Sequence, residues 1–413
     1  YSQEGYQMTD AEANATYECI RKVDIFNDVK TLDFDEGIKS GKIELIPSSV
    51  NEAFYECVLS RRVNPDAVAK GKLKLIYTPL NGTGNKPVRE VLKRAGFDDV
   101  TVVPSQEHPD GHFPTCPYPN PEIRQAFEEA LKLAENKKAD LLLATDPDCD
   151  RVGIAVNTGD GYKLMSGNEV GVLLTEYVLS SMKAAGTLPK APVIVKSFVT
   201  TSLVDRVAES YGCEVRDVLT GFKYIGEIAT ELEKKNEGER FILGMEESYG
   251  YLSGLHARDK DAVVSSMLIC EMASFYKIQG KTLVQKMAEI YEKYGYYKNI
   301  LLNFTFEGES GMEKMGDIMT SLREHAPEEI AGMKVIETAE RVDILSGKVS
   351  EIKLPKSNVL AYKLPDGNSV IVRPSGTEPK LKAYVTACGK DENHASALGE
   401  QLGEAIEKIL GIK

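Results

Sequence analysis

Short apolar runs and amphipathic stretches alternate along most of the chain. The apolar runs Leu73–Tyr77 and Val193–Ser197 each have the length of a buried strand, and Pro87–Ala95 and Ser202–Tyr211, which follow them, place apolar residues at helical spacing. A further amphipathic stretch predicts a helix over Pro121–Asn136. Strands that alternate with helices in this way are typical of α/β domains. The pattern therefore predicts consecutive α/β domains with mixed sheets over most of the sequence.

The pattern changes beyond Tyr294. A predicted strand over Asn299–Phe306 and a predicted helix over Met312–His325 are followed by several apolar segments of strand length, and a last helix is predicted over His394–Leu410. Strands that follow one another directly predict a smaller, C-terminal α+β domain. Near the other end of the chain, the alternation in Lys42–Ile46 predicts one more strand.

The composition is that of an ordinary globular protein. Of the 413 residues, 42% are hydrophobic and 27% are charged, and a chain of this length exceeds a single hydrophobic core. A net charge of −13 argues against nucleic acid and anionic membranes as main partners, because both repel an acidic surface. No apolar run approaches the ~20 residues that span a bilayer. Seven dispersed cysteines without a C-x-x-C pair predict reduced thiols and a cytoplasmic protein.

Three aspartates alternate in one short loop between two apolar runs. They are Asp146, Asp148 and Asp150. Residues two apart in extended backbone point the same way, so the carboxylates can converge, and their mutual repulsion favours a cation between them. Oxygen ligands favour a hard ion such as Mg²⁺. A solvated acidic turn remains an alternative, whereas a calcium EF-hand is disfavoured because Arg151 occupies the position of its glycine.

A second constellation lies between two predicted strands of the last domain. It consists of Arg373, Ser375, Gly376 and Thr377. A guanidinium, two hydroxyls and a glycine whose amide can approach closely form a suitable cradle for a phosphate. Proline and glycine also make ordinary turns, so a structural turn is the alternative. The density of anion-binding groups favours the phosphate site.

Three further segments carry weaker signals. Glu246 and Ser248 follow the predicted strand Phe241–Leu243, and a carboxylate beside a hydroxyl suits the hydroxyl groups of a sugar. Lys223 lies where a loop enters a helix and could meet an anion, although a surface lysine is the simpler interpretation. The loop Asn81–Asn85 lies between a strand and a helix, as phosphate loops do, but the pattern favours a plain turn.

Taken together, these motifs resemble those of the phosphohexomutase family, the phosphoglucomutases and phosphomannomutases. The segments that carry the resemblance are Thr145–Arg151, Gly221–Lys223, Glu246–Gly250 and Arg373–Pro379. Two of them, around Lys223 and Ser248, look closer to phosphoglucomutases. The resemblance covers nearly the whole chain. It implies an enzyme in which a phosphoserine donates its phosphoryl group to a sugar phosphate, and the resulting bisphosphate turns over in a deep cleft.

The resemblance also implies roles for individual residues. Asp146, Asp148 and Asp150 would bind Mg²⁺, and glucose 1,6-bisphosphate would serve as activator. Arg151 would hold the phosphoserine, and Lys260 would transfer a proton. The other matched positions would bind a small sugar phosphate, and these are Lys223, Glu246, Ser248, Arg373, Ser375, Gly376 and Thr377.

The family has four domains, three of related α/β build and a smaller fourth. We expect residues 1–45 to be a remnant of the first domain, 46–165 the second domain with the metal loop, 166–297 the third with the sugar loop, and 298–413 the fourth with the phosphate loop. The family's nucleophilic serine lies in a Thr-Ala-Ser-His-Asn-Pro segment that this sequence lacks, and the sequence opens on Tyr1. We therefore expect these residues alone to be inactive as a phosphoglucomutase.

Three alternatives stay open on these motifs. A phosphomannomutase or phosphopentomutase would use the same residues, because Glu246 and Ser248 do not address the configuration at C2 of the sugar. A natural relative without the serine would bind sugar phosphates without turning them over. An unrelated magnesium-dependent phosphohydrolase would use the metal loop and leave the other motifs unexplained. The sequence does not indicate an oligomeric state.

Overall fold

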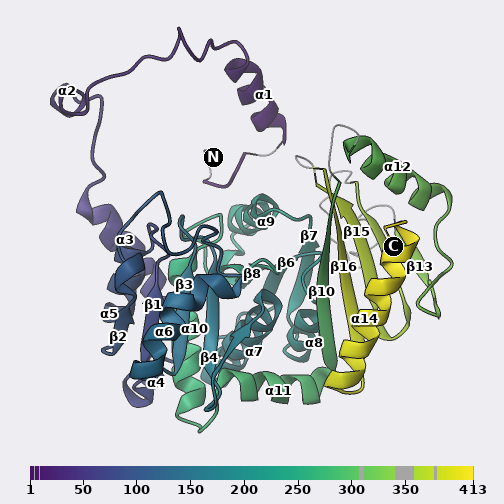
Figure 1. Ribbon diagram of the computed structural model, residues 1–413. Helices are drawn as coiled ribbons and strands as arrows, with labels where there is room; N and C mark the ends of the chain where they lie inside the picture. The colour runs from purple at the N-terminus through teal and green to yellow at the C-terminus, as the bar shows by residue number, and fades with distance from the viewer. Residues whose placement is uncertain (4, 9, 307–310, 340–357, 376–378, 413) are drawn as a thin grey trace.

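The computed structural model describes residues 1–412 apart from 4, 9, 307–310, 340–357 and 376–378 (Figure 1). The described residues form three sheets of four or five strands and one two-stranded ribbon, β11 (Glu329–Ile330) with β12 (Met333–Lys334). None of the helices that the structure describes combines the length and the apolar composition that crossing a membrane requires.

The first sheet has the strand order β2-β1-β3-β4-β5. Its strands are β1 (Leu75–Thr78), β2 (Val100–Val102), β3 (Leu141–Thr145), β4 (Val152–Asn157) and β5 (Tyr162–Met165). The first three are parallel, whereas β4 runs antiparallel to β3 and carries the chain back along it. The associated helices are α4 (Pro65–Gly71), α5 (Asn85–Ala95) and α6 (Glu128–Lys137). The aspartate loop is therefore the turn of the β3–β4 hairpin.

The second sheet repeats this arrangement with the order β7-β6-β8-β9. Its strands are β6 (Val193–Ser197), β7 (Glu214–Val218), β8 (Phe241–Glu246) and β9 (Gly250–Leu252). Here too the first three are parallel and the last is antiparallel, so the segment with Ser248 is the turn of the β8–β9 hairpin. The helices of this region are α7 (Gly167–Ala185), α8 (Leu203–Ser210), α9 (Phe222–Lys234), α10 (Ala262–Lys277) and α11 (Leu283–Tyr294).

Helix α10 joins the first two sheets. It is buried along almost its whole length and contacts α4, α5 and α7 as well as β3, β4 and β9. One hydrophobic cluster consequently includes Leu75 and Leu143 of the first sheet together with Ile194 and Leu243 of the second. A helix that is apolar on every side is stable only inside a protein, and this shared core is where α10 lies.

The third sheet is antiparallel in every described pair of strands and has the order β10-β16-β15-β14-β13. It contains β10 (Tyr296–Thr305), β13 (Glu337–Ala339), β14 (Leu360–Lys363), β15 (Ser369–Pro374) and β16 (Lys380–Gly389). Helix α14 (Glu392–Ile409) packs on β10 and β16, and α12 (Gly311–Glu324) lies beside the same sheet (Figure 1). A separate hydrophobic cluster fills this unit. The predicted fold class, α/β domains followed by a smaller α+β domain, is confirmed.

The prediction of a strand at Lys42–Ile46 is wrong. These residues form no strand, and Leu45 and Ile46 are 70% and 73% exposed. They belong to an N-terminal stretch with α1 (Asp10–Ile20) and α2 (Phe34–Lys39) that arches away from the sheets before α3 (Ser48–Leu59) packs on α5 (Figure 1). An alternating segment without a neighbouring strand has no partner for its backbone hydrogen bonds.

The predicted helix over Pro121–Asn136 begins later than expected. A short 3₁₀ turn covers Arg124–Phe127 before α6 starts at Glu128. Pro119 and Pro121 favour extended backbone ahead of it, because the residue before a proline is restricted to that region. The division of the chain at residues 45, 165 and 297 stays a prediction, although each large sheet falls almost wholly within one of the proposed ranges.

A buried carboxylate ties three helices of the shared core together. Glu271 of α10 is fully buried, and its Oε1 accepts hydrogen bonds from the backbone amides of Val63 and Asn64 at 2.9 and 3.0 Å and from the hydroxyl of Tyr177 at 2.9 Å. These donors lie before α4 and on α7. Losing the acceptor removes this partner from the buried hydroxyl of Tyr177 and from two half-buried amides.

We predict that Glu271→Ala lowers the free energy of unfolding by about 2–4 kcal/mol, because it removes buried volume and leaves these donors without their acceptor. Glu271→Gln keeps an acceptor oxygen in place and should lose less than half as much. Urea unfolding followed by circular dichroism measures both changes. A Glu271→Ala protein as stable as the parent would mean that the three hydrogen bonds contribute no net stability.

Candidate functional site

The aspartate loop brings its three carboxylates together. Asp146, Asp148 and Asp150 each offer an oxygen, and these oxygens lie within 4.8 Å of one another. The loop is shaped by Asp146, whose Oδ1 accepts the backbone amides of Asp150 and Arg151 at 3.0 and 2.9 Å. Its Oδ2 is left for other partners. Three converging carboxylate oxygens fit a hard divalent ion, so this cluster could hold a metal.

The charge of the loop is only partly balanced by the protein. Burial, together with the neighbouring carboxylates of Asp150 and Asp148, raises the pKa of Asp146 to about 7. The hydrogen bond from the backbone of Arg151 opposes this shift. At neutral pH a proton therefore occupies Asp146 in a substantial fraction of molecules, and a divalent cation would displace that proton.

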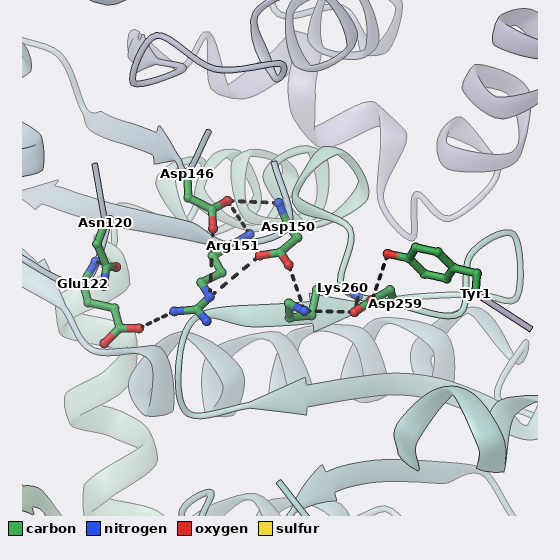
Figure 2. Close-up of polar contacts among 8 residues, drawn as sticks. All are labelled: Tyr1, Asn120, Glu122, Asp146, Asp150, Arg151, Asp259 and Lys260. Atoms are coloured by element: carbon green, nitrogen blue, oxygen red, sulfur yellow. Dashed lines mark hydrogen bonds and ion pairs between the residues drawn. The ribbon is translucent and has the colours of Figure 1, made fainter. Parts of the chain in front are cut away.

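Two cations flank the loop (Figure 2). The guanidinium of Arg151 forms an ion pair with Glu122 at 3.0 Å and lies 3.7 Å from a carboxylate oxygen of Asp150. Lys260 lies between Asp150, at 2.8 Å, and Asp259, at 2.9 Å. Burial would lower the pKa of Lys260, but the two carboxylates outweigh it and raise the pKa, so this residue is a cation. It could act only as an acid in this state.

The aspartate loop and the Ser248 turn are joined by backbone pairing. Arg151 and Gly250 form an antiparallel bridge, and the amide of Val152 donates to the carbonyl of Tyr249 at 3.1 Å. Gly250 is required at this point, because a Cβ there would lie 2.4 Å from the side chain of Lys260. The stem of Lys260 thus crosses the bridge and reaches Asp150 from the second sheet.

Glu246 is held at the start of α9. Its Oε1 accepts the amide of Gly221 at 2.7 Å, where Gly221 has a φ of 119° that favours glycine. Burial and the neighbouring Glu247 raise the pKa of Glu246 to about 7. The ionised form can accept hydrogen bonds from ligand hydroxyls, as a sugar-binding carboxylate must.

A cavity of about 470 Å³ connects the three sheets. Of the residues predicted from the sequence, Arg151, Glu246, Ser248 and Arg373 line it. The described residues that line the cavity do not include Lys223, Lys260 or Ser375, nor the three aspartates of the loop, Asp146, Asp148 and Asp150. Gly376 and Thr377 lie outside the described residues, so their predicted role stays a prediction.

Lys223 lies at the first turn of α9, where its ammonium group is 5.0 Å from the ring centre of Tyr224. Ser375 follows β15 and donates its amide to the carbonyl of Lys380 at 2.7 Å. This bond closes the ladder between β15 and β16 next to Arg373. These contacts do not test the predicted phosphate-binding roles of Lys223 and Ser375, which stay predictions.

Sequence reasoning missed several residues that line the cavity. Lys382 of β16 pairs directly across the ladder with Arg373 of β15, and both line the cavity. Asn120 and Glu122 reach it because Gly153 lets their segment lie on β4, where a Cβ would be 2.5 Å from the carbonyl of Pro121. Only the strand register could have indicated Lys382, and no local signal marks Glu122.

Three family models match parts of the sequence. Residues 52–159 match the phosphoglucomutase/phosphomannomutase alpha/beta/alpha domain II, 166–294 match its alpha/beta/alpha domain III, and 319–399 match its C-terminal domain. A phosphoglucomutase of Staphylococcus epidermidis is 34% identical over 415 residues, which cover 98% of this chain and 73% of the relative. The chain belongs to the phosphoglucomutase/phosphomannomutase family.

A second relative supports the family, and two solved structures share the fold. The phosphoglucomutase of Staphylococcus saprophyticus is 33% identical over 93% of this chain and 69% of its own length. The crystal structure of the phosphoglucomutase pp63/parafusin from Paramecium, in an open form, has a TM-score of 0.64 at 16% identity and covers 88% of this chain and 62% of that one. A family protein from Burkholderia thailandensis has a TM-score of 0.57 at 16% identity, over 87% of this chain and 64% of that one.

The family prediction made from the motifs is therefore confirmed, with curated phosphoglucomutases among the relatives. Phosphohexomutases are intramolecular phosphotransferases, and this chain matches three of the domains of that enzyme class. It spans 69% to 73% of the two staphylococcal relatives and under two thirds of the two solved structures.

The raised pKa of Asp146 leads to a prediction for metal binding. Below about pH 7 the association constant for Mg²⁺ should fall, by up to about tenfold per pH unit, because the ion must displace the proton. Asp148→Asn removes one negative charge, so it should weaken binding and move this pH dependence to lower pH. Calorimetric titrations at several pH values, in buffers of different ionisation enthalpy, count the released protons. Affinity that is constant from about pH 5.5 to 8 would contradict the proton on Asp146.

Proposed function

We propose that the protein interconverts glucose 1-phosphate and glucose 6-phosphate, with a phosphoserine as donor and glucose 1,6-bisphosphate as intermediate and activator. The observation that carries the proposal is the cavity in which Arg151, Glu246, Ser248 and Arg373 meet beside the aspartate loop. Phosphoryl transfer depends on positioning and charge neutralisation, and such a cavity supplies both. Staphylococcal relatives that carry the name phosphoglucomutase support the choice of sugar.

Asp146, Asp148 and Asp150 are the proposed ligands of Mg²⁺. Their carboxylate oxygens, which lie within 4.8 Å of one another, fit this ion, and burial beside the carboxylates of Asp150 and Asp148 raises the pKa of Asp146. When bound, Mg²⁺ would neutralise negative charge on the transferring phosphoryl group. Arg151 would bind that group from the side, because its guanidinium already lies near Asp150. Lys260, which is protonated, would donate a proton to the oxygen that leaves.

The other end of the cavity would hold the sugar and its second phosphate. Glu246 accepts and Ser248 donates or accepts hydrogen bonds, so the pair would hold two sugar hydroxyls. Arg373 would bind the phosphate that is not transferred, with Lys382 opposite it on β16. Ser375, Gly376, Thr377 and Lys223 complete the proposed phosphate contacts on the strength of the family motifs. A bisphosphate could then place one phosphate near Arg151 and the other near Arg373.

Phosphomannomutase and phosphopentomutase activities are secondary candidates, because hydrogen bonds from Glu246 and Ser248 do not distinguish the configuration at C2. A cytoplasmic location is part of the proposal, since it suits dispersed cysteines and a substrate of central sugar metabolism. A serine-less binding protein is the remaining alternative. It predicts affinity for sugar phosphates without turnover under any condition.

Turnover tests the proposal most directly. Residues 1–413 and a chain that carries the family's Thr-Ala-Ser-His-Asn-Pro domain ahead of them should be compared in a coupled assay with glucose-6-phosphate dehydrogenase, primed with glucose 1,6-bisphosphate. We expect only the longer protein to convert glucose 1-phosphate, and to prefer it to mannose and ribose phosphates. Turnover by residues 1–413 alone would place the nucleophile elsewhere. No turnover by either protein would favour the binding protein.

Arg373→Ala tests the phosphate end of the cavity without requiring turnover. Loss of a charge-assisted, half-buried contact should weaken binding of glucose 6-phosphate by about 2–4 kcal/mol. Arg323→Ala, on α12 and not among the described residues lining the cavity, is the matched control and should bind like the parent. Isothermal titration calorimetry on residues 1–413 gives both dissociation constants. Equal affinities for Arg373→Ala and the parent would mean that Arg373 does not bind the phosphate and has only a structural role in β15.

A further inference from the structure

The loop between β1 and α5 packs directly against the aspartate loop. Within Asn81–Gly84, the backbone amide and the hydroxyl of Thr83 both donate to the carbonyl of Pro147, at 2.8 and 3.1 Å. Pro147 lies between Asp146 and Asp148, so these two hydrogen bonds act on the backbone that carries two of the three converging carboxylates.

The two glycines of this loop allow the contact. A Cβ on Gly82 would lie 2.4 Å from Cα and 2.5 Å from the carbonyl oxygen of Pro147, which is backbone and cannot turn aside. A Cβ on Gly84 would lie 2.7 Å from Oγ1 of Thr145 and 2.9 Å from Sγ of Cys149. Both ends of the aspartate loop are therefore in contact with glycine backbone.

The loop lies between a strand and a helix, as phosphate loops do, but the donors of Asn81, Gly82 and Thr83 are already used. Besides the two bonds from Thr83, the amide of Gly82 donates to the carbonyl of Pro79 at 2.9 Å. The amide of Asn81 donates to the carbonyl of Gln106 at 2.9 Å, and its side chain donates to the carbonyl of His108 at 2.8 Å. These bonds fix the loop beside Pro147, so it can serve as a support for the aspartate loop.

We infer that Asn81–Gly84 is a positioning element of the metal site. It sets the place of Pro147 and thereby the separation of the carboxylates of Asp146 and Asp148. Ligands in such a site must be held to within about half an ångström, and groups behind the ligands commonly change metal affinity by about tenfold to a hundredfold. This inference rests on the proposed binding of Mg²⁺.

Two glycine-to-alanine substitutions, one of them a control, test the steric part of the inference. Gly82→Ala must displace Pro147, so the affinity for Mg²⁺ should fall at least about tenfold. Gly161→Ala, in the β4–β5 turn, is the matched control, because nothing lies within 4 Å of its added Cβ and its φ is not positive. It should bind Mg²⁺ like the parent. Calorimetric titration of residues 1–413 with MgCl₂ measures the affinities, and thermal unfolding in EDTA reports whether each variant folds.

Two substitutions at Thr83 keep the inference testable if Gly82→Ala fails to fold. Thr83 is exposed, so Thr83→Val removes one hydrogen bond with little change of shape, and the affinity for Mg²⁺ should fall about fivefold while the unfolding temperature in EDTA stays that of the parent. Thr83→Ser restores the hydroxyl and should restore the affinity.

The two proposals fail in different ways. A parent protein that does not bind Mg²⁺ would overturn the proposed metal site, and with it the positioning role. A parent that binds Mg²⁺, together with a Thr83→Val variant that binds it equally tightly, would overturn the positioning role alone.

Discussion

The backbone bridge between β4 and β9 is the constraint on which the arrangement of the site depends. The pairing of Arg151 with Gly250, with the bond from Val152 to Tyr249, sets the turns of two hairpins edge to edge. Each hairpin joins the last of three parallel strands to an antiparallel strand, and in the first sheet β5 lies beyond that antiparallel strand. Because each turn carries a different chemistry, carboxylates in one and a sugar-type pair in the other, this bridge brings the chemistry of two separate sheets together.

Charge is the second organising factor. The site gathers carboxylates from the aspartate loop, from Glu246 and from Glu247, and burial raises the pKa of Asp146 and Glu246 to about 7. Arg151 and Lys260 offset part of this charge through short ion pairs (Figure 2). The three carboxylates of the loop outnumber these two cations, and Arg373 and Lys382 are paired across the β15–β16 ladder. A divalent cation beside the loop and a phosphate beside Arg373 would neutralise these charges.

There are physical reasons why the sequence pattern predicted some elements and missed others. Strands β1 and β6 and helix α5 carry strong local patterns and lie as predicted. Helix α10 has no polar face to mark its period, because it is buried between two sheets. The alternating segment Lys42–Ile46 has the pattern of a strand but no neighbour to pair with. Local pattern therefore predicts an element well where the apolar run or the amphipathic period is distinct and the element has its partners in the fold.

The sequence by itself determined the kinds of chemistry present. Asp146, Asp148 and Asp150 are close in the chain, so a single turn is enough to bring their oxygens together, and the family motifs follow from such local spacing. Only the tertiary structure decided which motifs share a cavity, since Arg151, Glu246 and Arg373 come from three different sheets. It also decided that Asn81–Gly84 contacts Pro147 of the aspartate loop. Contacts between residues far apart in the chain depend on strand order and register, which no local pattern contains.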